Sequence, residues 1–208
     1  MRGVLSDAVA LDAALSYLSK KDKKLAAVIK KARPEPIKKR TFDFASVVSV
    51  IISQQLSGSA AKTIYARIVS LCGGSVTSIK LENVTDEQIR QCGISTSKVN
   101  FIRALQKHLA KNPHYFNIIS DMLPDDAMLE LKKLKGIGEW TASILVLFYL
   151  QHPDIFPIGD ASLNKAIRHI YGIEPYDHEL VVPRWAPYRS VASVCLWRFI
   201  DIGALESS

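Results

Sequence analysis

The apolar residues of this chain recur at helical spacing along almost its whole length. A clear example is the segment 44–52, whose apolar residues include Phe44, Val47, Val48, Ile51 and Ile52. This i, i+3, i+4, i+7, i+8 pattern indicates a helix with one buried face, although the β-branched run 47–52 would also suit a strand. Similar stripes recur in roughly ten segments, each ended by glycine, proline or small polar residues. We therefore predict an all-α fold.

The composition excludes several classes of protein. Hydrophobic residues make up 48% of the 208 residues and charged residues 23%, which is typical of a globular protein with its own core. No apolar run approaches the roughly 18–20 residues of a membrane span, so no membrane partner is expected. Two aspartates, Asp7 and Asp12, interrupt the first apolar stretch, which a secretory signal would avoid. Cys72, Cys92 and Cys195 are too far apart for a disulfide framework, a zinc site or an iron–sulfur cluster.

The positive charge is concentrated in one segment. The net charge is +7, and residues 20–40 hold ten lysines and arginines against two acidic residues. This segment carries +8, so the rest of the chain carries −1. A surface that faces nucleic acid would have this character, and so would a solvated helix face followed by a basic loop. Charge alone leaves both interpretations open.

A glycine hairpin is the most specific local motif. Residues 131–142 read LKKLKGIGEWTA, and two predicted helices meet at Gly136-Ile137-Gly138. The first N–H groups of the second helix lack partners within the helix, and glycine lets a phosphate approach the backbone closely. The helix dipole also favours an anion there. The motif predicts a phosphate-binding site that does not depend on the base sequence. An ordinary turn between two helices would have a similar sequence.

Asp160 begins the helix after the next loop. An aspartate in this position is usually an N-cap, whose carboxylate accepts hydrogen bonds from the first turn. The same position also aims a carboxylate out of the loop, toward whatever the hairpin holds. The sequence is compatible with both roles.

Four motifs in order resemble the helix–hairpin–helix (HhH-GPD) DNA glycosylase superfamily, and its 3-methyladenine, or alkylbase, branch most closely. They are ISQQLS followed by AAK (52–62), LKGIGEWTA (134–142), DIFPIGD (154–160), and RWAPYRS followed by LW (184–197). The resemblance covers about residues 40–205. It implies two helical lobes with a cleft between them. One lobe combines residues 1–40 with 160–208, and the other holds 41–159, including the helix–hairpin–helix motif at 131–150.

The resemblance also implies a role for individual residues. Asp160 matches the catalytic aspartate, and Trp140 and Trp197 lie near the base pocket. The residues that it places on DNA are Gln54, Gln55, Leu56, Ser57, Lys62, Gly136, Gly138, Thr141 and Arg189. Among these, residues 54–56 match the loop that fills the gap left by the extruded base. No cofactor is required, but the backbone carbonyls of Lys132, Leu134 and Gly136 match a site for a structural Na⁺ or K⁺.

Two departures from the family pattern shape the expected activity. Bifunctional members carry a nucleophilic lysine two residues after the second hairpin glycine, and here that residue is Trp140. Ile144 stands where some relatives have a pocket tyrosine. The resemblance therefore implies a monofunctional DNA glycosylase without lyase activity. It would flip and hydrolytically excise alkylated purines, such as 3-methyladenine and 7-methylguanine, from damaged duplex DNA in base excision repair.

Two other functions remain open from the sequence. The first is a non-catalytic reader of abasic or damaged DNA on the same scaffold, which the hairpin and the 54–56 loop would serve equally well. The second is a structural helix–hairpin–helix clamp, which accounts for the two glycines but not for Asp160 and the tryptophans. We expect a monomer, located in the cytoplasm with the nucleoid if the source is prokaryotic and in the nucleus if it is eukaryotic.

Overall fold

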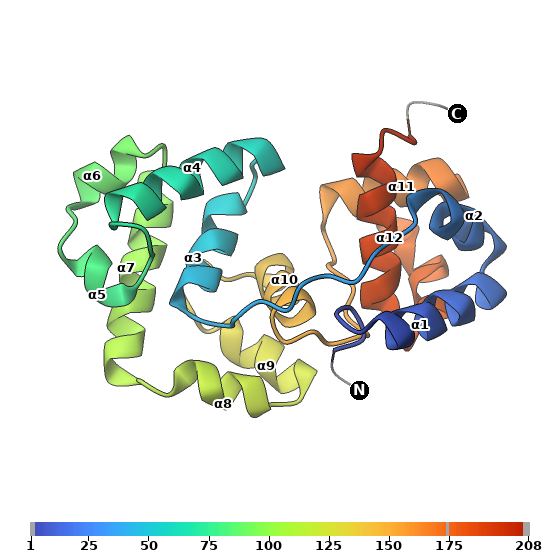
Figure 1. The fold of residues 1–208 in the computed structure, drawn as a ribbon, viewed down its shortest axis with the longest axis horizontal. Coiled ribbons are helices and arrows are strands. Elements are labelled where there is room, and N and C mark those ends of the chain that lie inside the picture. Colours follow the sequence, from blue (N-terminus) through green and yellow to red (C-terminus); the bar gives the residue numbers. More distant parts are fainter. Residues whose placement is uncertain (1–2, 174, 206–208) are drawn as a thin grey trace. The chain divides into compact units, whose positions relative to one another are not determined.

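The structure, a computed structural model, describes residues 3–173 and 175–205, and it confirms the all-α prediction (Figure 1). Within these ranges the chain forms twelve α-helices and two short 3₁₀ helices, and it contains no strand. None of the described helices combines the length and the apolar character that a membrane span needs. The chain divides into two compact units, residues 41–145 and residues 1–40 with 146–208.

The second boundary lies earlier than the expected residue 160. The segment 146–159 belongs to the terminal unit, because Leu147 and Phe156 are buried in that unit's core. Ser190 also binds this segment directly. Its hydroxyl donates to the carbonyl of His152 at 2.6 Å and accepts from the amide of Ile155 at 2.9 Å. The loop that leads to Asp160 is therefore built on the terminal unit.

The terminal unit is organised around its last helix. It contains α1 (Ala8–Lys21), α2 (Lys23–Ala32), α11 (Ala161–Tyr171), η1 (Pro175–Leu180), η2 (Val182–Trp185) and α12 (Arg189–Asp201). α12 packs against α1, α2 and α11, as Figure 1 shows. Trp185 is fully buried in the shared core, together with Leu18 and Leu25 from the first two helices. Burial of these large apolar side chains is the main stabilising contribution in this unit.

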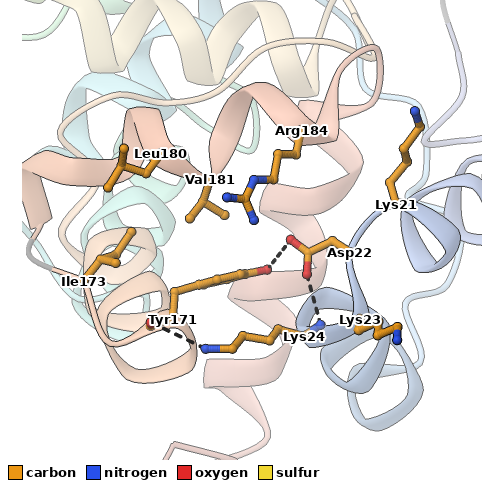
Figure 2. A pocket seen from close by; sticks show the side chains of 9 residues that line it. All are labelled: Lys21, Asp22, Lys23, Lys24, Tyr171, Ile173, Leu180, Val181 and Arg184. Atoms are coloured by element: carbon orange, nitrogen blue, oxygen red, sulfur yellow. Dashed lines mark hydrogen bonds between the residues drawn. The ribbon is translucent and has the colours of Figure 1, made fainter.

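Asp22 joins several elements of the terminal unit (Figure 2). It ends α1 and caps α2, accepting from the amides of Lys24 and Leu25 at 3.0 Å each. Its other oxygen accepts from the Tyr171 hydroxyl at 2.8 Å and from the Trp185 indole N–H at 3.1 Å. Burial alone would raise the pKa of Asp22, but these hydrogen bonds outweigh it and hold the pKa below its usual value. Asp22 lines a 430 Å³ pocket together with four basic residues, Lys21, Lys23, Lys24 and Arg184.

The middle unit comprises the remaining helices. They are α3 (Phe44–Ser53), α4 (Gly58–Leu71), α5 (Ser78–Glu82), α6 (Asp86–Gln91), α7 (Thr96–Lys111), α8 (Tyr115–Asp121), α9 (Pro124–Leu131) and α10 (Glu139–Phe148), which begins in this unit. The β-branched run 47–52 lies within α3, so the helical interpretation of that segment is confirmed. Seven of the ten residues of α3 are buried, and the helix packs against α4 and α7. α3 is thus a core helix whose C-terminal end carries the 54–57 loop.

Candidate active site

The hairpin connects α9 to α10 in the middle unit. Gly136 has φ +85°, and a Cβ placed on it would come within 2.2 Å of the Phe101 ring. Glycine is therefore required at this position by the packing of the unit itself. Gly138 is exposed and has open space around its Cα, so its backbone is accessible. The ammonium of Lys132 lies 2.7 Å from the carboxylate of Glu139 and links the two sides of the turn.

Gln54 ties the loop after α3 to this hairpin. Its side-chain amide donates to the carbonyl oxygen of Gly136 at 2.8 Å and to the hydroxyl oxygen of Thr141 at 2.9 Å. The resemblance placed Gln54 and Thr141 on DNA, but both side chains have partners within the protein. Thr141 is only 3% exposed. Their geometry is that of a brace between the loop and the hairpin.

The rest of the loop is exposed. Gln55 adopts a left-handed backbone with φ +57°, and Leu56, which follows it, is 40% exposed. Ser57 caps α4 by accepting from the amide of Ala60 at 3.3 Å, and Lys62 lies exposed one turn further along. An exposed leucine at the tip of a turn is suited to entering a base stack.

One residue in this region was not found from the sequence. Lys98, on α7, donates from its ammonium to the carbonyl oxygens of Ile52 at 2.8 Å and Gln54 at 2.7 Å. Burial lowers the pKa of Lys98. The contacts span more than forty residues of sequence, and no local pattern marks Lys98 among the chain's other lysines.

Asp160 lies at the N-terminus of α11 in the terminal unit. It is 9% exposed, and its Oδ1 accepts from the amide of Leu163 at 2.8 Å. The same oxygen accepts from the indole N–H of Trp197, on α12, at 3.2 Å. The capping interpretation is therefore correct, and the two donors also fix the carboxylate in one orientation.

Trp197 is the aromatic partner of this carboxylate. Its ring stacks on Phe148 with a centroid separation of 5.5 Å and an interplanar angle of 24°. Both rings line a pocket of 280 Å³ that also includes Pro34, Glu35 and Ile37 from the segment after α2. Trp140, the other predicted pocket residue, belongs to the middle unit and is half-buried in the first turn of α10.

Arg189 has a partner within the protein, although the resemblance placed it on DNA. Its guanidinium binds the carboxylate of Asp154 through two hydrogen bonds of 2.7 and 2.8 Å, and its backbone amide binds the same group at 3.1 Å. Burial alone would raise the pKa of Asp154, but the hydrogen bonds and charge of Arg189 hold it below its usual value. The pair fixes the start of the loop that ends in Asp160.

The carbonyl groups predicted to hold a cation lie in the hairpin turn. The oxygen of Leu134 accepts from the amide of Ile137 at 3.1 Å, and that of Gly136 accepts from Gln54. A carbonyl oxygen has two lone pairs, so each can accept a further contact. Na⁺ and K⁺ prefer such neutral oxygen ligands, and these residues therefore fit the predicted ion, which stays a prediction.

Comparisons with known proteins show the family to which the chain belongs. Residues 48–184 match the family model described as "HhH-GPD superfamily base excision DNA repair protein". DNA-3-methyladenine glycosylase 1 of Schizosaccharomyces pombe is 25% identical over 191 residues, which cover 88% of this chain and 84% of the relative. The crystal structure of a DNA-3-methyladenine glycosidase from Bacillus halodurans is 30% identical, with a TM-score of 0.74 over 92% of this chain and 90% of that one.

A third comparison supports the fold alone. The 3-methyladenine DNA glycosylase of Schizosaccharomyces pombe, solved in complex with abasic DNA, has a TM-score of 0.80 at 22% identity, over 90% of this chain and 96% of that one. The family model covers well over half of the chain and includes the hairpin and Asp160. The chain therefore belongs to the HhH-GPD superfamily of base excision DNA repair proteins.

Proposed function

We propose that this protein is a monofunctional DNA glycosylase that excises alkylated purines, of the 3-methyladenine and 7-methylguanine type, from duplex DNA. The observation that carries the proposal is Asp160, a buried carboxylate held by the amide of Leu163 and the indole of Trp197. The names of the relatives point to the same chemistry.

The mechanism follows from the bond that is broken. Cleavage of an N-glycosidic bond builds positive charge on the deoxyribose, and a fixed carboxylate stabilises that charge. Asp160 also orients the attacking water in this scheme. A single carboxylate suffices when the leaving base is already cationic, because no acid then has to protonate it. Alkylated purines are bases of this kind.

Aromatic side chains bind the extruded base in the proposed complex. The target base must leave the duplex before its bond can be attacked. Trp197 and Trp140 offer faces that attract a cationic ring, each with about 0.5–2 kcal/mol of cation–π energy. The stacked Phe148 holds the Trp197 ring in place. These groups favour positive charge without reading the edge of a neutral base.

Damaged duplex DNA is the proposed partner, bound by a monomer. The exposed amides near Gly138 bind a phosphate at the start of α10, and Leu56 with Gln55 fills the space that the flipped base leaves. A Na⁺ or K⁺ held by the carbonyls of Lys132, Leu134 and Gly136 would add positive charge beside that phosphate. No other cofactor is required in this proposal.

The decisive experiment incubates the protein with methylated duplex DNA and identifies the released bases by chromatography. Wild-type protein should release 3-methyladenine. Asp160→Asn should reduce release by at least about a hundredfold, the scale of removing one electrostatic stabiliser, because it removes the charge. Asparagine can still cap α11 and accept from Trp197, so folding and duplex binding should persist.

Two results would contradict the proposal. Near-normal release by Asp160→Asn would remove the catalytic role from this residue. Tight binding to damaged duplex with no base release by the wild-type protein would favour the alternative, a non-catalytic reader of abasic or damaged DNA.

A further inference from the structure

The end of α3 is held from two sides. A helix leaves its last four carbonyl groups without partners in the helix. Here the ammonium of Lys98 binds the carbonyl oxygens of Ile52 and Gln54, at 2.8 and 2.7 Å. On the other side, the Gln54 side chain binds the hairpin at Gly136 and Thr141. The main chain of residue 54 is therefore fixed to α7 and its side chain to the hairpin.

This double attachment coincides with an unfavourable backbone conformation. Gln55 has φ +57°, a left-handed conformation that residues with a side chain rarely adopt. Such a conformation persists where the surrounding contacts determine it. The contacts of Lys98 end at the carbonyl of residue 54, immediately before Gln55. The next residue, Leu56, is exposed at the tip of the turn.

We propose that Lys98 is a positioning residue, which keeps residues 54–57 in the shape that enters the DNA stack, while Gln54 links this loop to the phosphate-binding hairpin. The proposal rests on the proposed function, because it assigns the loop to the gap left by the flipped base. A loop that is already shaped before DNA arrives avoids an ordering cost on binding. Lys98 acts only through this loop and does not touch the reacting atoms.

Its ammonium suits this task. Each contact is a charge-assisted hydrogen bond, which is stronger than one between neutral groups. One ammonium satisfies two backbone oxygens of a helix end, where the helix dipole also favours positive charge. Methionine has nearly the same length without donors or charge, whereas arginine retains both. These two substitutions separate the polar contacts from the packing of the side chain.

The test measures binding to two duplexes at one salt concentration. One contains a tetrahydrofuran abasic analogue, whose gap the loop would fill, and the other is undamaged. The readout is the ratio of the two dissociation constants. Lys98→Met should lower the preference for the abasic duplex by at least about threefold, the effect of one net hydrogen bond. Affinity for the undamaged duplex, which depends on the hairpin and general charge, should change less than the preference does.

Three variants make the experiment specific. Lys98→Arg should retain most of the preference. Lys107→Met is the matched control, because it removes a charge from an exposed position of the same helix, and it should leave the preference unchanged. Gln55→Asn added to Lys98→Met should restore part of the preference, because asparagine adopts left-handed backbone more readily. All proteins are compared at a temperature at which circular dichroism shows them folded.

Several outcomes would overturn the inference. It fails if Lys98→Met lowers the melting temperature but keeps the preference, if Lys107→Met causes the same loss, or if the wild-type protein has no preference. Should Lys98→Met not fold, Lys98→Gln is judged by the same threshold. Base release is assayed separately. A wild-type protein that prefers the abasic duplex without releasing bases would contradict the proposed catalysis alone.

Discussion

The carboxylate of Asp160 has a structural and a proposed chemical role that do not compete. As an N-cap it accepts from the amide of Leu163, and this bond fixes its position at the start of α11. The indole N–H of Trp197 then fixes its orientation. Electrostatic catalysis needs a charge that is already in place before the reaction. The cap therefore supplies the rigidity that the proposed mechanism requires.

The role of the Trp197 indole can be tested by Trp197→Phe. Phenylalanine keeps an aromatic ring against Phe148 but cannot donate to Asp160. We expect the single-turnover rate of 3-methyladenine release to fall by about three- to tenfold, the effect of one net hydrogen bond. Trp197→Ala should be slower still, because it also removes the stacking surface. A wild-type rate for Trp197→Phe would mean that the hydrogen bond does not orient the carboxylate.

Trp140 predicts the absence of lyase activity. Its indole cannot form a Schiff base with the deoxyribose, and the family resemblance matches it to the nucleophilic lysine of bifunctional members. We expect borohydride to trap little covalent protein–DNA adduct, while a bifunctional glycosylase treated in parallel is trapped efficiently. Product strands should stay intact until alkali is added. Efficient trapping that persists after replacement of the neighbouring lysines would contradict this expectation.

Among the elements, the junction of α1 and α2 shows how one residue organises the terminal unit. From the sequence, Asp22 was only one of the two acidic residues in the basic segment 20–40. In the structure it binds Tyr171 on α11 and Trp185 on η2, far along the chain. Several neighbouring lysines also pack on aromatic rings, with Lys24 over Tyr171 and Lys31 over Phe199. Part of the basic segment therefore serves the fold, and its contact with DNA remains a prediction.

Asp22→Asn should destabilise the protein by about 2 kcal/mol at pH 7. Asparagine has no charge and only one acceptor oxygen, so one of the two donor pairs that Asp22 binds loses its acceptor. The pKa of Asp22 is lower in the folded state than its usual 3.8. Its contribution is therefore fully present above pH 3.8 and is lost as the pH falls through the folded-state pKa. Urea unfolding of both proteins from pH 7 to pH 2.5 measures this. A stability difference that does not shrink in acid would contradict it.

For the molecule as a whole, the sequence predicted those structural features that depend on residues close together in the chain. The 3.6-residue period and the glycine and proline stops predicted the helices, and Gly136-Ile137-Gly138 predicted the hairpin. Contacts between residues far apart in the chain could not be predicted, because no local sequence pattern marks them. Gln54 meets Gly136 across 82 residues, and the packing of Phe156 moves the unit boundary from 160 to 146. Gly136 was assigned to phosphate approach, yet the Phe101 ring alone requires glycine there.

Substrate preference depends on several parts of the molecule together. The proposal assigns one carboxylate and two tryptophans to the reaction, and by resemblance Ile144 matches a position where some relatives have a pocket tyrosine. No basic or amide side chain on α10 is placed to read the Watson–Crick edge of a neutral base. Such a site discriminates weakly by shape, so the weakness of the lesion's own glycosidic bond does much of the selection. Cationic bases gain further from the aromatic faces.

We therefore expect a ranked set of excision rates. 3-Methyladenine should be released fastest, 7-methylguanine and ethenoadenine more slowly, and uracil and 8-oxoguanine slowest. Single-turnover rates on defined duplexes, with enzyme in excess and one salt concentration throughout, provide the comparison. Asp160→Asn measured on the same duplexes is the control for contaminating glycosylases. If uracil were excised faster than 3-methyladenine, the pocket would have to read a neutral base edge. The argument from charge and bond weakness would then be wrong.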